Sequence, residues 1–242
     1  MLELFANTWK TYSRHVGMML YFAIPFLISL AIPLLSPAPT YAALGGYFLR
    51  SGSLPAMSII DWAIIAIELV ISIYLLALAL VVINLIVKAT RTRTRVGAEA
   101  LRNIGKYSFV VFCLFLAVKI IETGILWLSL ERGVTEWIVY LFGFLASLGL
   151  FYAAPAVVLE EKKPAKAFAA SYSHIVRKPD LFILWLVIAF ISLAIVTGIT
   201  YALIETPGWR QIAVALINSI IVLPLLLILQ AHMYLTKYTI LK

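Results

Sequence analysis

The chain is poor in the residues that a soluble protein needs on its surface. Only 12% of its 242 residues are charged, with 11 acidic side chains against 19 basic ones, whereas 64% are hydrophobic. A soluble protein of this size would require far more polar surface. The mean hydropathy of +1.04 therefore places most of the length in hydrocarbon and predicts an integral membrane protein.

Sequence signals for chemistry are also scarce. The single cysteine, Cys113, has no partner for an intrachain disulfide and is expected to be a small core residue. The sequence contains no phosphate-binding loop, zinc-protease motif or nucleophile elbow. Three histidines, His15, His174 and His232, lie far apart in sequence, and single histidines at a membrane edge are usually solvated. We therefore expect no enzyme activity, no metal site and no cofactor.

The most informative feature that is present is a set of six long apolar segments. A helix crosses a bilayer with about 20 mostly apolar residues. Such segments lie at 17–36, 59–87, 107–130, 134–158, 180–203 and 210–238. Their continuous apolar runs favour helices over the short alternating segments of membrane-spanning strands. The predicted fold is all-α, with six transmembrane helices in a single polytopic domain over residues 1–242.

Basic residues are distributed unequally between the loops on the two sides. One side carries Lys10, Arg14, Lys88, Arg91, Arg93, Arg95, Arg102, Lys106, Lys162, Lys163, Lys166, Arg177, Lys178, Lys237 and Lys242. Of the basic residues in loops, the other side holds Arg50, Arg132 and Arg210. Lys and Arg accumulate in cytoplasmic loops. We therefore expect a multi-pass protein of the cell membrane with both termini in the cytoplasm.

Short amphipathic or basic segments precede the odd-numbered spans, at 2–14, 96–106 and 164–178. The first has large apolar residues at helical spacing, namely Leu2, Phe5, Trp9 and Tyr12. Such segments suit helices lying in the cytoplasmic interface. They predict a unit of one interfacial helix plus a hairpin, at 1–88, 96–158 and 164–238. Two interpretations stay open, a true three-fold repeat and the generic architecture of hairpins.

Two groups of residues carry a resemblance to a known family. One contains Leu159, Glu160, Glu161, Ala167, Ser171 and the run Ile175, Val176, Arg177, Lys178; the other contains Phe5, Trp9, Tyr12, Arg14 and Gly17. They resemble a family of six-span membrane proteins that includes the bacterial YciC type and the membrane domain fused to some glycerophosphodiester phosphodiesterases. The resemblance implies a six-span helical domain. The fused members carry catalysis in a separate soluble barrel, so no catalytic residue is carried over.

The segment with Glu160, Glu161, Ser171 and Arg177 is a candidate interfacial motif on the cytoplasmic side. One interpretation is that it docks a helix against the membrane or a partner. The other is local, because acidic residues at the start of a helix and basic ones at its end match the helix dipole.

Charged residues inside the hydrocarbon are costly and are candidates for function. Asp61, Glu68 and Ser72 share one face of the second span, and Lys119 and Glu122 lie in the third. A Glu68–Lys119 ion pair could line an outward-opening cavity. Alternatively, Lys119 and Glu122 pair on their own helix, since they are three residues apart.

Other polar and small residues in the spans are expected to serve packing. Asn84, Asn218 and Gln230 are expected to form hydrogen bonds between helices. Pro224 should bend the last span and release the carbonyl of Ile220. A pair of small residues in the fourth span, Gly149 and Ala153, permits close helix packing.

The chain has a run of alternating arginines, Arg91, Arg93 and Arg95. We assign this run to binding of anionic lipid headgroups and not of nucleic acid, because the positive charge of the chain, +8 net, lies along a membrane surface. The predicted function is a non-enzymatic membrane protein that scaffolds or organises membrane lipids or protein partners, a second copy of the chain included. The alternative is a small-solute or lipid transporter that uses the Glu68 and Lys119 cluster.

Overall fold

The computed structural model describes residues 2–17, 23–25, 27–28, 31–32, 56–92, 98–132 and 137–237. Within these ranges the regular elements are all helical. They are α1 (Leu2–Arg14), α4 (Ile59–Thr92), α5 (Ala98–Arg132), α6 (Trp137–Phe151), α7 (Ala153–Glu160), α8 (Pro164–Arg177), α9 (Pro179–Leu203), α10 (Pro207–Ile217), the π-helical turn η1 (Asn218–Val222) and α11 (Leu223–Leu235).

Five stretches of helix in the described chain are long and apolar enough to cross a bilayer. They are Ile59–Thr92, Asn103–Ser129, Trp137–Glu160, Pro179–Leu203 and Pro207–Leu235. Their ends lie within a few residues of the second to sixth predicted spans. The predicted span at 17–36 lies largely outside the described residues. An all-helical fold with several membrane-length helices is therefore confirmed for the described chain.

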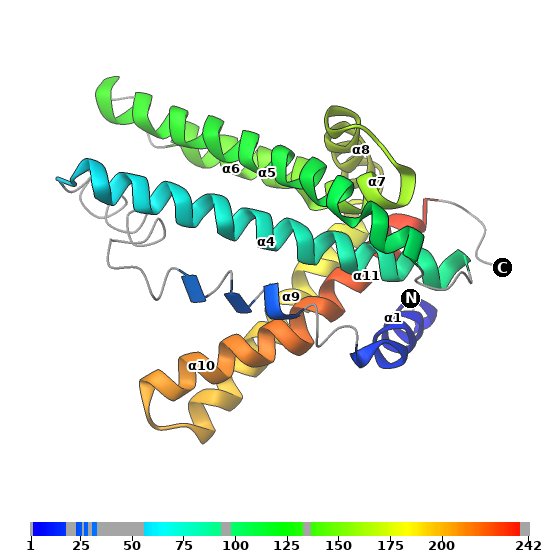
Figure 1. Cartoon of the computed structure of the whole chain (residues 1–242). Coiled ribbons are helices and arrows are strands. Elements are labelled where there is room, and N and C mark those ends of the chain that lie inside the picture. Colours follow the sequence, from blue (N-terminus) through cyan, green and yellow to red (C-terminus); the bar gives the residue numbers. More distant parts are fainter. Residues whose placement is uncertain are drawn as a thin grey trace.

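The helices meet at one end of the molecule and diverge toward the other (Figure 1). We call the meeting point the closed end; it contains α1, α7, α8, the start of α5 and the C-terminal halves of α4 and α11. At the opposite, open end, the α5–α6 hairpin and the α9–α10 hairpin point in different directions.

The buried core lies toward the closed end, with α4 as its central helix. Ile83 and Ile86 of α4 pack in one apolar cluster with Ile228 and Ala231 of α11. Of the 18 most apolar consecutive residues of α4, 67% are buried, whereas in the corresponding stretch of α9 only 6% are buried. The apolar surface of α9 is thus left for lipid, because an exposed apolar area of this length is incompatible with water.

Two of the three predicted amphipathic segments form separate helices, α1 and α8. The second does not, since Ala98 to Lys106 is the first part of the continuous helix α5. No proline interrupts this stretch, and Gly105 alone weakens a helix by only about 1 kcal/mol. The unit of helix plus hairpin therefore does not recur in its predicted form.

Candidate functional site

The helical stretch Trp137–Glu160, which corresponds to the fourth predicted span, is broken at Tyr152, between α6 and α7. Tyr152 has φ −97° and ψ 12°, outside the helical range. Pro155, three residues on, has no N–H and leaves the carbonyl of Phe151 without its helical donor. Gln230 of α11 supplies the missing donor, because its Nε2 lies 2.7 Å from the Phe151 oxygen. The bonding of Gln230 between helices agrees with the expectation from the sequence, whereas the break itself was not predicted.

Ser171 of α8 inserts into the same break. Its hydroxyl accepts a hydrogen bond from the backbone N–H of Tyr152 at 2.9 Å and donates one to the carbonyl of Leu148 at 2.7 Å. These two backbone groups would bond each other in an unbroken helix. The serine hydroxyl thus replaces one helical hydrogen bond by two, and it attaches α8 to the fourth span. Ser171 thus holds α8 against α6 of the same chain, and docking of this segment against the membrane or a partner stays a prediction.

Gly149 provides the space for this docking. A Cβ atom built on Gly149 would overlap the ring of Phe168 on α8. Ala153, four residues on, is fully buried. The small pair therefore permits close approach of a neighbour, as predicted, and the neighbour is the short helix α8.

An aromatic cluster surrounds His174 on the buried side of α8. Its ring centroid lies 4.8 Å from that of Tyr152 and 5.2 Å from that of Tyr234 on α11. The expectation that His174 is solvated is wrong, because its side chain is buried in this junction of α7, α8 and α11. Burial lowers the pKa of His174, and the charge of Lys178 lowers it further.

Acidification is expected to destabilise the fold in part through His174. Since its pKa is lowered in the folded state from the ordinary 6.5, the unfolded chain binds the proton more readily. Its stabilising contribution is complete above this value and is lost as the pH falls below it. The free energy of unfolding in detergent should fall as the pH drops below 6.5. His174→Asn should flatten this dependence. His15→Asn is the control, and an unchanged slope in His174→Asn would contradict the assignment.

The acidic pair Glu160 and Glu161 ends α7 and does not begin α8, which starts at Pro164. The interpretation that this acidic pair lies at the positive end of the dipole of α8 is therefore wrong. Acidic groups at a helix C-terminus are unfavourable on their own. Here Lys237 beyond α11 contacts Glu160 at 3.2 Å, and Lys162 pairs with the same carboxylate.

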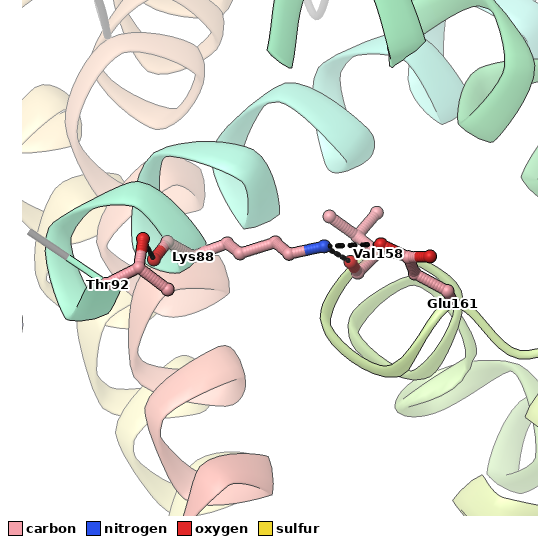
Figure 2. Close-up of polar contacts among 4 residues, drawn as sticks. All are labelled: Lys88, Thr92, Val158 and Glu161. Carbon is pink, nitrogen blue, oxygen red and sulfur yellow. Dashed lines mark hydrogen bonds and ion pairs between the residues drawn. The ribbon is translucent and has the colours of Figure 1, made fainter. Parts of the chain in front are cut away.

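Lys88 of α4 neutralises the charge of Glu161, the second residue of the acidic pair. Figure 2 shows its Nζ reaching the end of α7, where it lies 3.0 Å from Oε1 of Glu161 and donates to the carbonyl of Val158 at 3.1 Å. The hydrogen bond from Lys88 holds the pKa of Glu161 below its ordinary value, with a smaller contribution from Tyr107. Glu161 adopts a left-handed conformation with φ 54°, which terminates α7.

A second interruption lies in the last span, at the π-helical turn η1. Pro224 follows this turn and cannot donate to the carbonyl of Ile220, as the sequence predicts. The hydroxyl of Tyr12 on α1 donates to that carbonyl at 3.1 Å. Oγ1 of Thr11 also lies 3.3 Å from Nε2 of His232 on α11. A polar face of α1 is thus attached to this helix at two points, the bend through Tyr12 and the C-terminal part of α11 through Thr11.

The opposite face of α1 is exposed and carries large aromatic side chains. Phe5 is 39% exposed and Trp9 61% exposed. Lys10 and Arg14 are also exposed. Tyr12, predicted to share the apolar face with Phe5 and Trp9, instead packs inward. The face left open combines aromatic and basic groups, a combination that suits a membrane interface.

The predicted intramembrane cluster is divided by the structure into three parts. Asp61 forms a capping box with Ser58, whose hydroxyl lies 2.7 Å from Oδ2 of Asp61. Lys119 pairs with Glu122 at 2.6 Å on its own helix, the local alternative. A Cβ atom built on Gly143 of α6 would lie 3.3 Å from Oε1 of Glu122, so the pair borders α6.

Glu68 and Ser72 form the third part. They are 9% and 4% exposed. Neither the Oε2 atom of Glu68 nor the Oγ atom of Ser72 has a hydrogen-bond partner in the described chain. The Glu68–Lys119 ion pair considered for transport is absent among the described residues, because Lys119 is engaged by Glu122.

The remaining predicted residues lie at the closed end or outside the described ranges. Arg177 is exposed at the end of α8, and Arg91 is exposed at the end of α4. Arg93 and Arg95 lie outside the described residues. Asn84, expected to bond between helices, donates instead to the carbonyl of Leu80 on its own helix at 2.8 Å.

The described residues contain no group of three histidine, cysteine or acidic side chains placed to hold a metal ion. Comparison of the chain with protein-family models, with curated proteins and with solved structures found no match. Two features of the described chain bear on its function. These are the closed end with its exposed face of α1, and the buried Glu68 and Ser72.

Proposed function

We propose that the chain is a non-enzymatic, six-span protein of the cell membrane that organises lipids or protein partners at its cytoplasmic face. One observation carries the proposal. Helix α1 is attached to the last span by Thr11 and Tyr12 and leaves Phe5 and Trp9 exposed. A helix that is fixed to the protein by its polar face and presents aromatic and basic groups is suited to hold lipid headgroups beside the bundle.

The charge of the closed end supports this proposal and the orientation that it requires. The basic side chains described there are Lys10, Arg14, Lys88, Arg91, Lys106, Lys162, Lys163, Lys166, Arg177, Lys178 and Lys237, whereas Arg210 lies at the open end. An excess of Lys and Arg is typical of the cytoplasmic side. The closed end is accordingly assigned to the cytoplasm, with both termini.

Single cysteines test this orientation. In a Cys113→Ala background, Ser173→Cys on α8 should react with a membrane-impermeant maleimide only after the cells are opened. Thr206→Cys before α10 should react in intact cells. Both positions are exposed, so accessibility depends on the side of the membrane. The reverse labelling pattern would contradict the proposed orientation.

Lipid retention tests the proposed function. Native mass spectrometry of the gently extracted protein should record bound anionic phospholipid. The double variant Lys10→Gln, Arg14→Gln should weaken that binding by about 2 kcal/mol, since each basic residue near the surface contributes about 1 kcal/mol. This corresponds to a roughly 30-fold loss of affinity. Trp9→Ala should weaken binding of anionic and zwitterionic lipid alike.

The matched control is Arg210→Gln at the open end, which removes the same kind of charge from the other side. It should leave the retained anionic lipid unchanged. Equal retention by the double variant and the parent protein would remove the support for lipid binding at α1. A protein partner that survives extraction in stoichiometric amount would favour partner assembly instead.

A second candidate, a small-solute or lipid transporter, is favoured by the burial of Glu68 and Ser72 in α4. Intramembrane carboxyls commonly mark solute or ion pathways. Glu68→Gln should abolish solute flux into proteoliposomes if the protein is a transporter, while the lipid retention described above remains.

A further inference from the structure

Glu68 and Ser72 lie on one face of α4, four residues apart, so their side chains are neighbours along the helix. Glu68 is nine residues from the start of α4 at Ile59, or about 14 Å at 1.5 Å per residue. Both residues are at least nine-tenths buried. The Glu68 Oε2 and Ser72 Oγ atoms have no hydrogen-bond partner among the described residues.

The charged groups of the neighbouring elements do not neutralise Glu68. On α4 itself, Asp61 is bound to Ser58. On α5, which packs against α4, Lys119 and Glu122 neutralise each other. On α11, the titratable side chains are His232, which contacts Thr11 at the closed end, and Tyr234, which packs against Tyr152 and His174.

Lys88, the basic residue of α4 closest in sequence to Glu68, lies 20 residues further on, a distance of about 30 Å along the helix. It is committed to Glu161 and to the carbonyl of Val158 at the end of α7. The Oε2 atom of Glu68 has no hydrogen-bond donor among the described residues, and a buried carboxylate without a counterion is strongly unfavourable, by several kcal/mol. The negative charge of Glu68 therefore requires a positive species that is not part of the described protein.

We propose that Glu68 and Ser72 form a binding site for a small monovalent cation, a proton or a sodium ion, which neutralises the carboxylate inside the membrane. The occupant must be small because the Oε2 atom of Glu68 and the Oγ atom of Ser72 have almost no exposed surface. The carboxylate supplies the charge and the serine hydroxyl supplies a second oxygen. The site requires neither lipid binding at α1 nor transport of a solute, and it can be tested apart from both.

Dicyclohexylcarbodiimide tests the site in the complete protein, because this apolar reagent reacts with protonated carboxyls inside membranes. The protein in lipid nanodiscs is treated at a series of pH values from about 5 to about 9, with and without sodium chloride, and the modified residue is identified by mass spectrometry of the peptides. Potassium chloride at the same concentration controls for ionic strength. We expect the label on Glu68 and its loss in Glu68→Gln, while Glu122→Gln keeps it.

The two cations predict different results. If the site holds a proton, the labelling of Glu68 falls as the pH rises and is the same in sodium and potassium. If it holds sodium, sodium protects Glu68 from the reagent and raises the Tm of the protein, and Ser72→Ala weakens both effects. Glu68→Gln should remove the dependence on sodium or on pH in either case.

The Tm measurement also covers the case in which the reagent does not reach the site. If Glu68 is not labelled at any pH, and if the Tm of the parent protein and of Glu68→Gln respond equally to sodium and to pH, the site does not bind a cation. Such a result would overturn the inference but would leave the lipid proposal for α1 intact, since that proposal depends on Lys10, Arg14 and Trp9.

Discussion

Ser171→Ala is expected to lower the free energy of unfolding by about 2–4 kcal/mol, because it leaves two buried backbone groups without partners. The N–H of Tyr152 and the carbonyl of Leu148 both depend on this hydroxyl. They cannot simply bond each other without closing the break in the fourth span. The break is also fixed by Pro155, which no side-chain change on α8 removes.

Denaturant titration in detergent micelles measures this effect. The control is Ser173→Ala, a serine on the exposed side of the same helix; it should change stability by less than about 0.5 kcal/mol. Ser171→Thr keeps the hydroxyl and tests whether the added methyl group is tolerated. If Ser171→Ala were as stable as Ser173→Ala, the inserted hydroxyl would have no energetic role.

Gly149→Leu is expected to destabilise the fold by about 1–3 kcal/mol, the usual range for overpacking. The new side chain would occupy the position of the Phe168 ring and push α8 away from α6. The loss should be partly restored in the double variant Gly149→Leu, Phe168→Ala, because the smaller residue on α8 makes room. Stability is measured as for Ser171.

The matched control for this substitution is Gly198→Leu on α9. A Cβ atom at Gly198 meets nothing within 4 Å, and leucine favours a helix over glycine by about 1 kcal/mol. Gly198→Leu should therefore be neutral or slightly stabilising. A loss of stability equal to that of Gly149→Leu would show that the cost arises from leucine in a membrane helix and not from Phe168.

The helices could be predicted from the sequence because burial in lipid requires long apolar runs, and such runs are visible in composition alone. Five stretches of helix end close to their predicted bounds. The freed carbonyl of Ile220 could also be predicted, since it follows from the chemistry of Pro224. The donor to it, Tyr12, could not be predicted, because the two residues are 208 positions apart.

Part of the candidate site could be predicted, because some of its residues are close in sequence. Lys119 and Glu122 are close in sequence, so their pairing was among the alternatives. The roles of Ser171 and Lys88 depend on which helices are neighbours at the closed end. A signal for the break was present in Pro155, which indicates an unsatisfied Phe151 carbonyl just as Pro224 indicates that of Ile220. The donor Gln230 again lies far away in sequence.

The hydrogen bonds of Tyr12 and Gln230 have a consequence for the order in which the protein is made. Synthesis proceeds at about 5–20 residues per second. Tyr12 is therefore complete roughly 10–40 s before Ile220, its acceptor 208 residues later. For part of that time the carbonyl of Phe151 lacks its hydrogen-bond donor, because Gln230 has not yet been made. The break at Tyr152 can be satisfied only after Gln230 has been made, 79 residues after Phe151, so the packing of this helix does not keep pace with its synthesis.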